Sequence, residues 1–192
     1  TMDLIKAYRP ETNSVSSGQV LQSPYTAVKA RNVVLEMADS VSLDLVDKKL
    51  VTDQLVLTIG YDTESLTDRD IREKYQGKIA TDRYGRQVPV HAHGTVNMER
   101  PTSSETILME KASGLFDRIV NPDLLVRRIT LSANHLMHEQ AEEEMLARER
   151  RRQEAVLQIK KKFGKNAILK GLNYADGATQ RERNRQIGGH HE

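Results

Sequence analysis

The sequence contains no cysteine, and this absence excludes several kinds of chemistry. Without thiols the chain has no disulfide, no cysteine nucleophile and no cysteine-ligated zinc site. A secreted disulfide-rich scaffold is therefore ruled out, and a cytoplasmic localisation is expected. Aromatic residues are also scarce, since there is no tryptophan and there are two phenylalanines. A surface that binds single strands by stacking bases on aromatic rings is therefore not expected.

Long apolar runs are missing as well. No stretch of about 18 apolar residues is present, and no charged segment followed by an apolar one opens the chain, so neither a membrane span nor a signal peptide is expected. We therefore predict a soluble protein without a membrane partner. Thr1 begins the chain and Met2 follows it, which suggests that the sequence was cut from something longer.

Charge is divided unevenly along the chain. Residues 1–138 contain 17 Lys+Arg and 18 Asp+Glu, a net charge of −1, whereas residues 139–192 contain 12 and 9, a net charge of +3. The near-neutral total of +2 therefore hides a basic C-terminal extension. The division predicts a compact unit over 14–138, preceded by a linker over 1–13 and followed by a charged helix over 139–165. The Gly-rich, charged tail over 166–192 is expected to be flexible.

The hydrophobic pattern of the compact unit predicts an α+β fold. Alternation of apolar and polar residues indicates strands, and apolar residues three or four apart indicate amphipathic helices. The order β-α-β-β-α-β predicts a four-stranded sheet with two helices on one face. The strands are expected at 14–21, 53–61, 88–98 and 124–134, the helices at 23–48 and 102–120, and a polar arm at 62–87.

Local signals set the expected helix ends. Ser23 and Pro24 suit an N-cap and a first helical position, and Thr102 to Glu105 read as a capping box. In the charged helix, Arg152, Val156, Ile159 and Phe163 fall on one stripe, which predicts a short apolar patch that docks on the domain or on a partner.

The sheet face that the helices leave uncovered is rich in hydroxyl, His and Arg side chains. Small hydroxyl residues let a phosphate approach strand amides, and Arg and His add donors, so this face suits a nucleic-acid backbone; simple solvation is the alternative. Arg127 and Arg128 are expected on opposite faces, and Arg83 and Arg86 on the arm are either solvated or reach toward a duplex. The candidate DNA-contacting residues are Ser14, Ser16, Ser17, Thr58, Arg83, Arg86, His91, His93, Thr95, Arg127, Arg128, Thr130 and Ser132.

No residue pattern in the sequence indicates an active site. The phosphate-binding, dinucleotide, serine-hydrolase and HExxH motifs are absent, so no catalytic residue and no cofactor are expected in this chain. His91 with His93, or His135 with His138, could begin a metal site, but no further ligands stand at a usual spacing. No metal site is predicted.

Several segments in one order resemble the C-terminal region of bacterial Y-family translesion DNA polymerases of the UmuC/DinB type. The resemblance covers nearly the whole chain. It rests on residues 5–10 (IKAYRP), 14–21 (SVSSGQVL), 45–48 (LVDK), 51–54 (VTDQ), 59–62 (IGYD), 91–95 (HAHGT), 125–129 (LVRRI), 162–166 (KFGKN) and 182–190 (ERNRQIGGH).

This resemblance implies that 14–138 form the little finger of an error-prone polymerase that acts in DNA repair, damage tolerance and the SOS response. The open sheet face would then bind primer-template DNA, with 14–17 and Arg127-Arg128 at the family's DNA-contact positions. Many relatives have Arg or Lys where this chain has Ser17 and Ser132, so its phosphate contacts are expected to be weaker or shifted to the arm.

The resemblance also implies what this chain lacks. The family's catalytic carboxylates and their Mg²⁺ ions belong to a palm outside this sequence, so the fragment alone is not expected to polymerise DNA. The tail from Lys170 onward is a candidate contact for a sliding clamp or a recombinase filament. An alternative interpretation is a protein-interaction module that binds another protein through its polar sheet and tail.

Overall fold

The computed structural model describes residues 14–138, 144–187 and 190–191. Within these ranges no helix combines the length and the apolar content that crossing a membrane requires. The linker expected over 1–13 lies outside the described residues.

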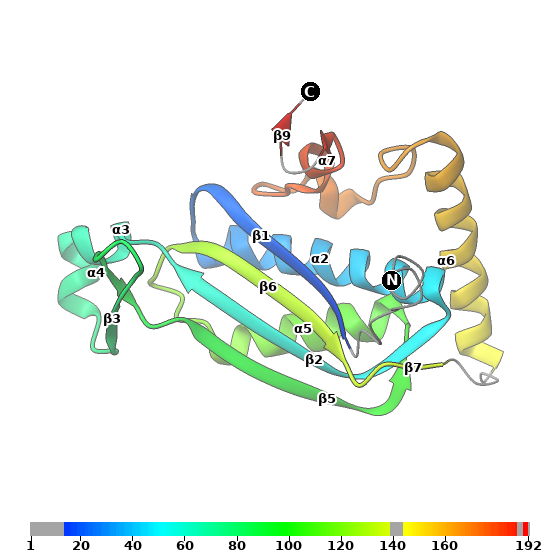
Figure 1. The fold of residues 1–192 in the computed structure, drawn as a ribbon, viewed down its shortest axis with the longest axis horizontal. Helices are drawn as coiled ribbons and strands as arrows, with labels where there is room; N and C mark the ends of the chain where they lie inside the picture. The colour runs from blue at the N-terminus through cyan, green and yellow to red at the C-terminus, as the bar shows by residue number, and fades with distance from the viewer. Residues whose placement is uncertain (1–13, 139–143, 188–189, 192) are drawn as a thin grey trace, which may run out of the picture.

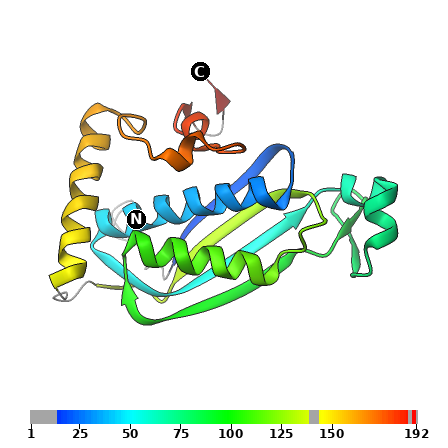
Figure 2. The same ribbon diagram turned by 180° about the vertical axis from the view of Figure 1, so that it is seen from behind.

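Four long antiparallel strands form the main sheet. They are β1 (Ser14–Tyr25), β2 (Leu50–Tyr61), β5 (Ala92–Thr102) and β6 (Val126–Asn134), and they lie in the order β1-β6-β2-β5. The short β7 (Met137–His138) extends the sheet by pairing with the start of β2. Helices α2 (Ala27–Lys48) and α5 (Glu105–Ile119) cover one face, and Figures 1 and 2 show the open and the covered face in turn. The predicted α+β fold is confirmed.

The core lies between the sheet and the two helices because the strands alternate in polarity. Leu55, Leu57 and Ile59 of β2 are fully buried, as the alternation predicts, and Leu131 of β6 lies beside them. The side chains between these residues point to the opposite, uncovered face. The core therefore fixes which side chains the open face presents.

Two helix starts differ from the prediction. Ser23 and Pro24 belong to β1, which continues until Tyr25 pairs with Val126, so α2 begins at Ala27 after Thr26. Strand pairing across the sheet thus overrides a local capping signal. In α5 the cap is Ser104, whose hydroxyl accepts a hydrogen bond from the backbone N–H of Ile107.

The arm folds as a small unit of its own. It contains α3 (Glu64–Thr67), α4 (Arg69–Lys74) and a hairpin of β3 (Ile79–Thr81) and β4 (Gln87–Pro89). The strand predicted over 88–98 is therefore two strands, because β4 pairs within the arm and β5 begins only at Ala92. Figure 1 shows the arm beyond the end of the sheet.

The charged helix α6 (Glu144–Phe163) docks through polar residues. Arg150 and Gln153 are buried, and both donate hydrogen bonds to Ser103, Gln153 to the carbonyl oxygen and Arg150 to the hydroxyl. Glu149 accepts hydrogen bonds from the Ser104 hydroxyl and the Thr106 N–H at the start of α5. In the predicted apolar stripe, Phe163 is 67% exposed and Ile159 is 37% exposed, so this end of the stripe does not pack on the domain, and its docking on a partner stays a prediction.

The tail also differs from the prediction, since residues 166–187 fold against α2. They form a 3₁₀ helix η1 (Gly171–Tyr174), a short helix α7 (Gln180–Arg183) and the strand β8 (Gln186–Ile187), which pairs with β9 (His190–His191). The physical reason is Glu36 of α2, which is fully buried and accepts hydrogen bonds from Asn173, Thr179 and Gln180. The hydrophobic pattern of a sequence does not indicate a buried polar contact of this kind, so the docking of the tail could not be predicted from it.

Candidate nucleic-acid interface

The strand register places the side chains of the open face in rows that cross all four long strands. Three rows take one residue from each of β1, β6, β2 and β5, and the fourth row lacks a β5 member; neighbouring partners in a row lie directly opposite one another. In this order the rows are Ser14, Asn134, Gln54 and Asn97; then Ser16, Ser132, Val56 and Thr95; then Gly18, Thr130, Thr58 and His93; and finally Val20, Arg128 and Gly60.

Side-chain hydrogen bonds run along these rows. The Gln54 amide donates to the Asn97 side-chain oxygen (3.0 Å) and accepts from the Asn134 amide (3.3 Å). Farther along the sheet, the Thr58 hydroxyl lies 2.9 Å from Nδ1 of His93. These contacts order the polar groups while leaving them at the surface, so the face presents fixed hydroxyl, amide and imidazole groups that can hydrogen-bond a ligand's oxygen atoms.

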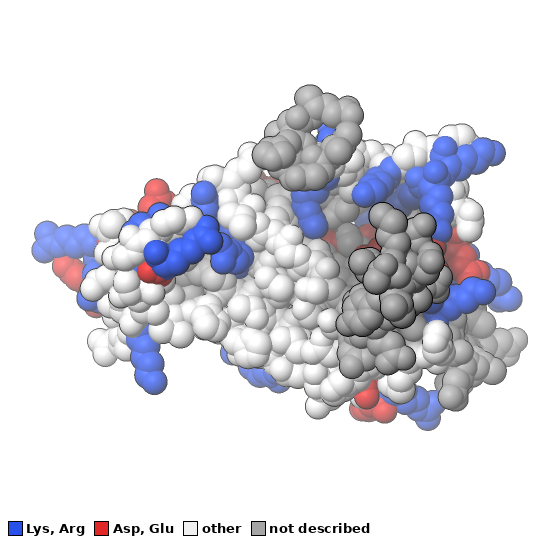
Figure 3. All heavy atoms as spheres, in the orientation of Figure 1, with Lys and Arg blue, Asp and Glu red and all other residues white. Residues whose placement is uncertain are grey.

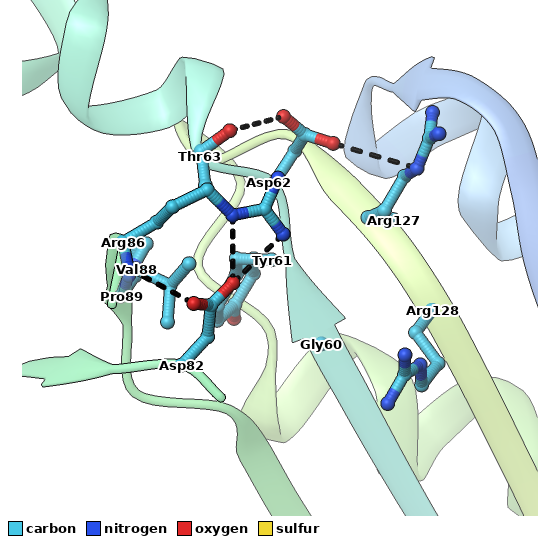
Figure 4. A pocket seen from close by; sticks show the side chains of 10 residues that line it. All are labelled: Gly60, Tyr61, Asp62, Thr63, Asp82, Arg86, Val88, Pro89, Arg127 and Arg128. Atoms are coloured by element: carbon cyan, nitrogen blue, oxygen red, sulfur yellow. Dashed lines mark hydrogen bonds and ion pairs between the residues drawn. The ribbon is translucent and has the colours of Figure 1, made fainter. Parts of the chain in front are cut away.

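A bulge in β6 determines where the two adjacent arginines point. Gly60 pairs with Arg128 and the next residue of β2, Tyr61, pairs with Val126, so Arg127 has no partner in the ladder. An extra residue in one strand breaks the alternation of side chains. Arg127 and Arg128 therefore line the same hollow, and the prediction that they point to opposite faces is wrong (Figure 4).

The two arginines nevertheless have different surroundings. The Arg127 guanidinium donates to the Gln22 carbonyl (2.9 Å) and pairs with Asp62 at 3.6 Å, which holds it between β1 and the arm. Arg128 is exposed, and within the described ranges its guanidinium has no hydrogen-bond or ion-pair partner. Gly60 makes room for it, since an added Cβ would stand 3.1 Å from the Arg128 Cβ. Arg128 is thus available to a ligand, whereas Arg127 supports the structure.

The hollow has a volume of about 300 Å³ and lies where the sheet meets the arm. Arg86 of the arm and Arg128 of β6 approach it from opposite sides, as Figure 4 shows. Asp82 holds Arg86 through an ion pair of 2.7 Å, and it also accepts hydrogen bonds from the backbone N–H groups of Arg86 and Tyr84. These bonds stabilise the charged carboxylate and lower the pKa of Asp82, with the Arg86 backbone as the largest cause.

The lowered pKa of Asp82 predicts how the arm tip responds to acid. A group with a lower pKa in the folded state stabilises that state above its unfolded pKa, and this contribution is lost as the pH falls through the folded value. We expect the Tyr84 and Arg86 amide signals in an NMR titration to move together with a midpoint below the ordinary aspartate value of about 3.9. An Asp82→Asn variant should lack this step, and a midpoint near pH 5 would contradict the prediction.

Positive charge is unevenly spread over the open face. The four rows contain one arginine and no acidic residue, and the middle of the face in Figure 3 carries neither sign, while Lys and Arg side chains, with Asp and Glu among them, lie over the arm. The interface is therefore a nearly uncharged polar floor with cations at its arm end.

Most of the predicted site residues share this surface, and some do not. Ser17 points to the helix side, where Arg183 of the tail donates to its hydroxyl at 3.3 Å. His91 lies in the connection between β4 and β5, and Arg83 and Arg86 lie on the arm tip. The open face itself brings together Ser14, Ser16, Thr58, His93, Thr95, Arg128, Thr130 and Ser132.

Sequence reasoning missed the row of Asn134, Gln54 and Asn97. These residues occupy the outward positions of their predicted strands, so alternation alone could have included them. As for metals, His, Asp and Glu side chains nowhere form a group of three or more that could hold an ion in the parts of the chain described.

Comparison with known proteins identifies a family whose model matches most of the chain. The impB/mucB/samB family C-terminal domain matches residues 12–147. Among solved structures, the chain is similar to one from a complex of a beta-clamp processivity factor and the little finger domain of PolIV, with 10% identity, a TM-score of 0.39, and coverage of 68% of this chain and 95% of that one.

A second similar structure is a post-insertion binary complex of Dbh DNA polymerase. It shares 10% identity at a TM-score of 0.36, and the match covers 72% of this chain and 34% of the polymerase. A search of curated protein sequences gave no match.

The family match extends over all strands of the sheet and both helices that cover it. It spans more than two thirds of the chain, which is the whole compact unit that the hydrophobic pattern predicts. The chain thus belongs to the impB/mucB/samB family C-terminal domain, the little finger of Y-family DNA polymerases.

Proposed function

We propose that the open sheet face binds the phosphate backbones of primer-template DNA for an error-prone translesion polymerase. In this proposal the chain holds the duplex, and nucleotide transfer with its Mg²⁺ ions belongs to the palm of the parent enzyme. The observation that carries the proposal is Arg128, an exposed cation whose guanidinium has no partner among the described residues and which lies in one of four rows that contain no acidic residue.

The surroundings of Arg128 suit a phosphate. Gly60 lies beside it on β2, and Gly18 lies one row away on β1, so little side-chain bulk separates a ligand from the strand backbones. Thr130 and Thr58 supply hydroxyl donors in that next row. Contacts of this type position a duplex through its backbone and do not read its bases.

A salt titration tests this function. Binding of the intact chain to a primer-template duplex should weaken steeply between about 50 and 200 mM salt, because phosphate contacts release counterions. Arg128→Ala should reduce the slope of log affinity against log salt by about one phosphate contact. Lys111→Ala removes the same charge from α5, on the covered side of the sheet, and should leave the slope unchanged.

Binding that is undetectable or independent of salt would contradict the proposal. It would favour the alternative that the polar face and tail bind another protein.

Protein partners are a separate proposal. A sliding clamp and a recombinase filament are the candidates, and the docked tail offers the exposed Tyr174 as a contact. The sequence 54–57 (QLVL) resembles a clamp-binding peptide in its letters, but Leu55 and Leu57 are fully buried in β2. That segment is therefore not available to a clamp.

A further inference from the structure

The tip of the arm hairpin presents an exposed aromatic ring beside two cations. Tyr84 is 65% exposed, and the guanidinium groups of Arg83 and Arg86 lie 4.7 and 5.2 Å from the centre of its ring. The ring makes no part of the hydrophobic core. In a chain with so few aromatic residues, a tyrosine placed at a loop tip beside two arginines offers planar surfaces on which a base can stack.

Backbone hydrogen bonds close the turn at the tip. Asp82 N–H donates to the Arg86 carbonyl (2.9 Å), and Gly85 N–H donates to the Asp82 carbonyl (3.0 Å). Gly85 has a φ of 77°, a left-handed conformation that favours glycine at this turn. With the turn closed by these bonds, a ligand pays little conformational entropy to meet Tyr84.

The tip also lies next to the place where the sheet presents Arg128. Arg86 joins the tip to the hollow that Arg128 lines (Figure 4), and the arm extends past the end of the sheet (Figure 1). Lys and Arg side chains, with Asp and Glu among them, lie over this end of the face in Figure 3. A strand whose phosphates contact Arg128 would therefore continue toward the arm.

We propose that the arm tip binds the single-stranded DNA that continues from a duplex held on the sheet. Tyr84 stacks on an unpaired base, and Arg83 contacts the adjoining phosphate. This inference rests on the proposed function for the position of the duplex. It assigns the arm a different ligand, since one aromatic ring at a tip can take an unstacked base but not a base inside a helix.

The test compares a blunt duplex with the same duplex carrying a short single-stranded extension, 5′ or 3′, with 2-aminopurine in the extension. The extension should tighten binding by the intact chain about tenfold, and stacking on Tyr84 should change the 2-aminopurine fluorescence. Tyr84→Ala should remove both effects and leave blunt-duplex affinity unchanged. Tyr84→Phe keeps the ring and should retain them.

The outcomes separate the two proposals. Normal blunt-duplex binding together with no gain from either extension would overturn the role of the arm and leave the sheet's function intact. If the blunt duplex is not bound, the proposed function of the sheet fails. A single-stranded oligonucleotide with the sequence of the extension then tests the arm by itself. Tyr84→Ala must weaken the binding of this oligonucleotide, and Arg128→Ala must not. Equal binding by the wild-type chain and Tyr84→Ala would overturn the role of the arm.

Discussion

Replacing Glu36 with alanine is expected to release the tail from α2. The backbone N–H groups of Thr179 and Gln180 should then exchange with solvent about a hundredfold faster, which corresponds to a loss of about 3 kcal/mol in local stability. Hydrogen exchange measured by NMR or mass spectrometry checks this. Trypsin cleavage within the tail should accelerate in parallel, because Arg181 lies in the released segment.

The size of this effect follows from the number of donors that one buried side chain satisfies. One Glu36 oxygen accepts from the Asn173 amide (2.8 Å), and the other accepts from the backbone N–H groups of Thr179 (2.8 Å) and Gln180 (3.1 Å). Removing the carboxyl group leaves these donors without a partner inside the protein and opens a cavity. Burial also lowers the pKa of Arg183 nearby, and Glu36 is the charge that opposes this shift.

Two controls separate the anchor from a general effect of substitution on a helix. Glu36→Gln keeps the shape, but an amide has one acceptor oxygen, so it should give an intermediate exchange rate. Glu110→Ala on the exposed side of α5 should leave the tail unchanged. Unchanged protection of Thr179 and Gln180 in Glu36→Ala would show that other contacts hold the tail.

The fold could be predicted from the sequence because its core depends on alternation. Leu55, Leu57 and Ile59 occupy every second position of β2, and burial follows that period without knowledge of the partners. The buried faces of the helices could be predicted in the same way, because their apolar residues recur three or four positions apart. Local signals were weaker, since Ser23 and Pro24 suit a helix start yet lie within β1.

The candidate site was less predictable because it depends on register and on contacts between distant residues. The bulge at Arg127 exists only when β2 and β6 are aligned, and it redirects one arginine of an adjacent pair. Ser17 shares the inward side of β1 with Val15, and the partner of its hydroxyl there is Arg183, 166 residues away. The bulge and the contact with Arg183 cannot be obtained from a local pattern.

Replacing Leu131 with alanine is expected to destabilise the whole domain by about 3–5 kcal/mol. Leu131 is fully buried in β6 and pairs with Ser17 of β1 on one side and Leu57 of β2 on the other. Truncation removes apolar contacts at the centre of the sheet and leaves a cavity that strands held on both sides cannot close. Thermal unfolding should show a melting temperature lower by about 10 °C.

The next residue, Ser132, provides the matched control, because it lies in the same strand as Leu131 but points to the opposite face of the sheet. Ser132 points to the open side, where its hydroxyl donates to Ser16 at 2.9 Å. Ser132→Ala should cost less than about 1 kcal/mol, since the lost bond is solvated. The pair therefore tests the assignment of the two faces as well as the core. Equal destabilisation by the two variants would mean that Ser132 is covered, and a covered Ser132 would remove the open floor on which DNA is proposed to lie.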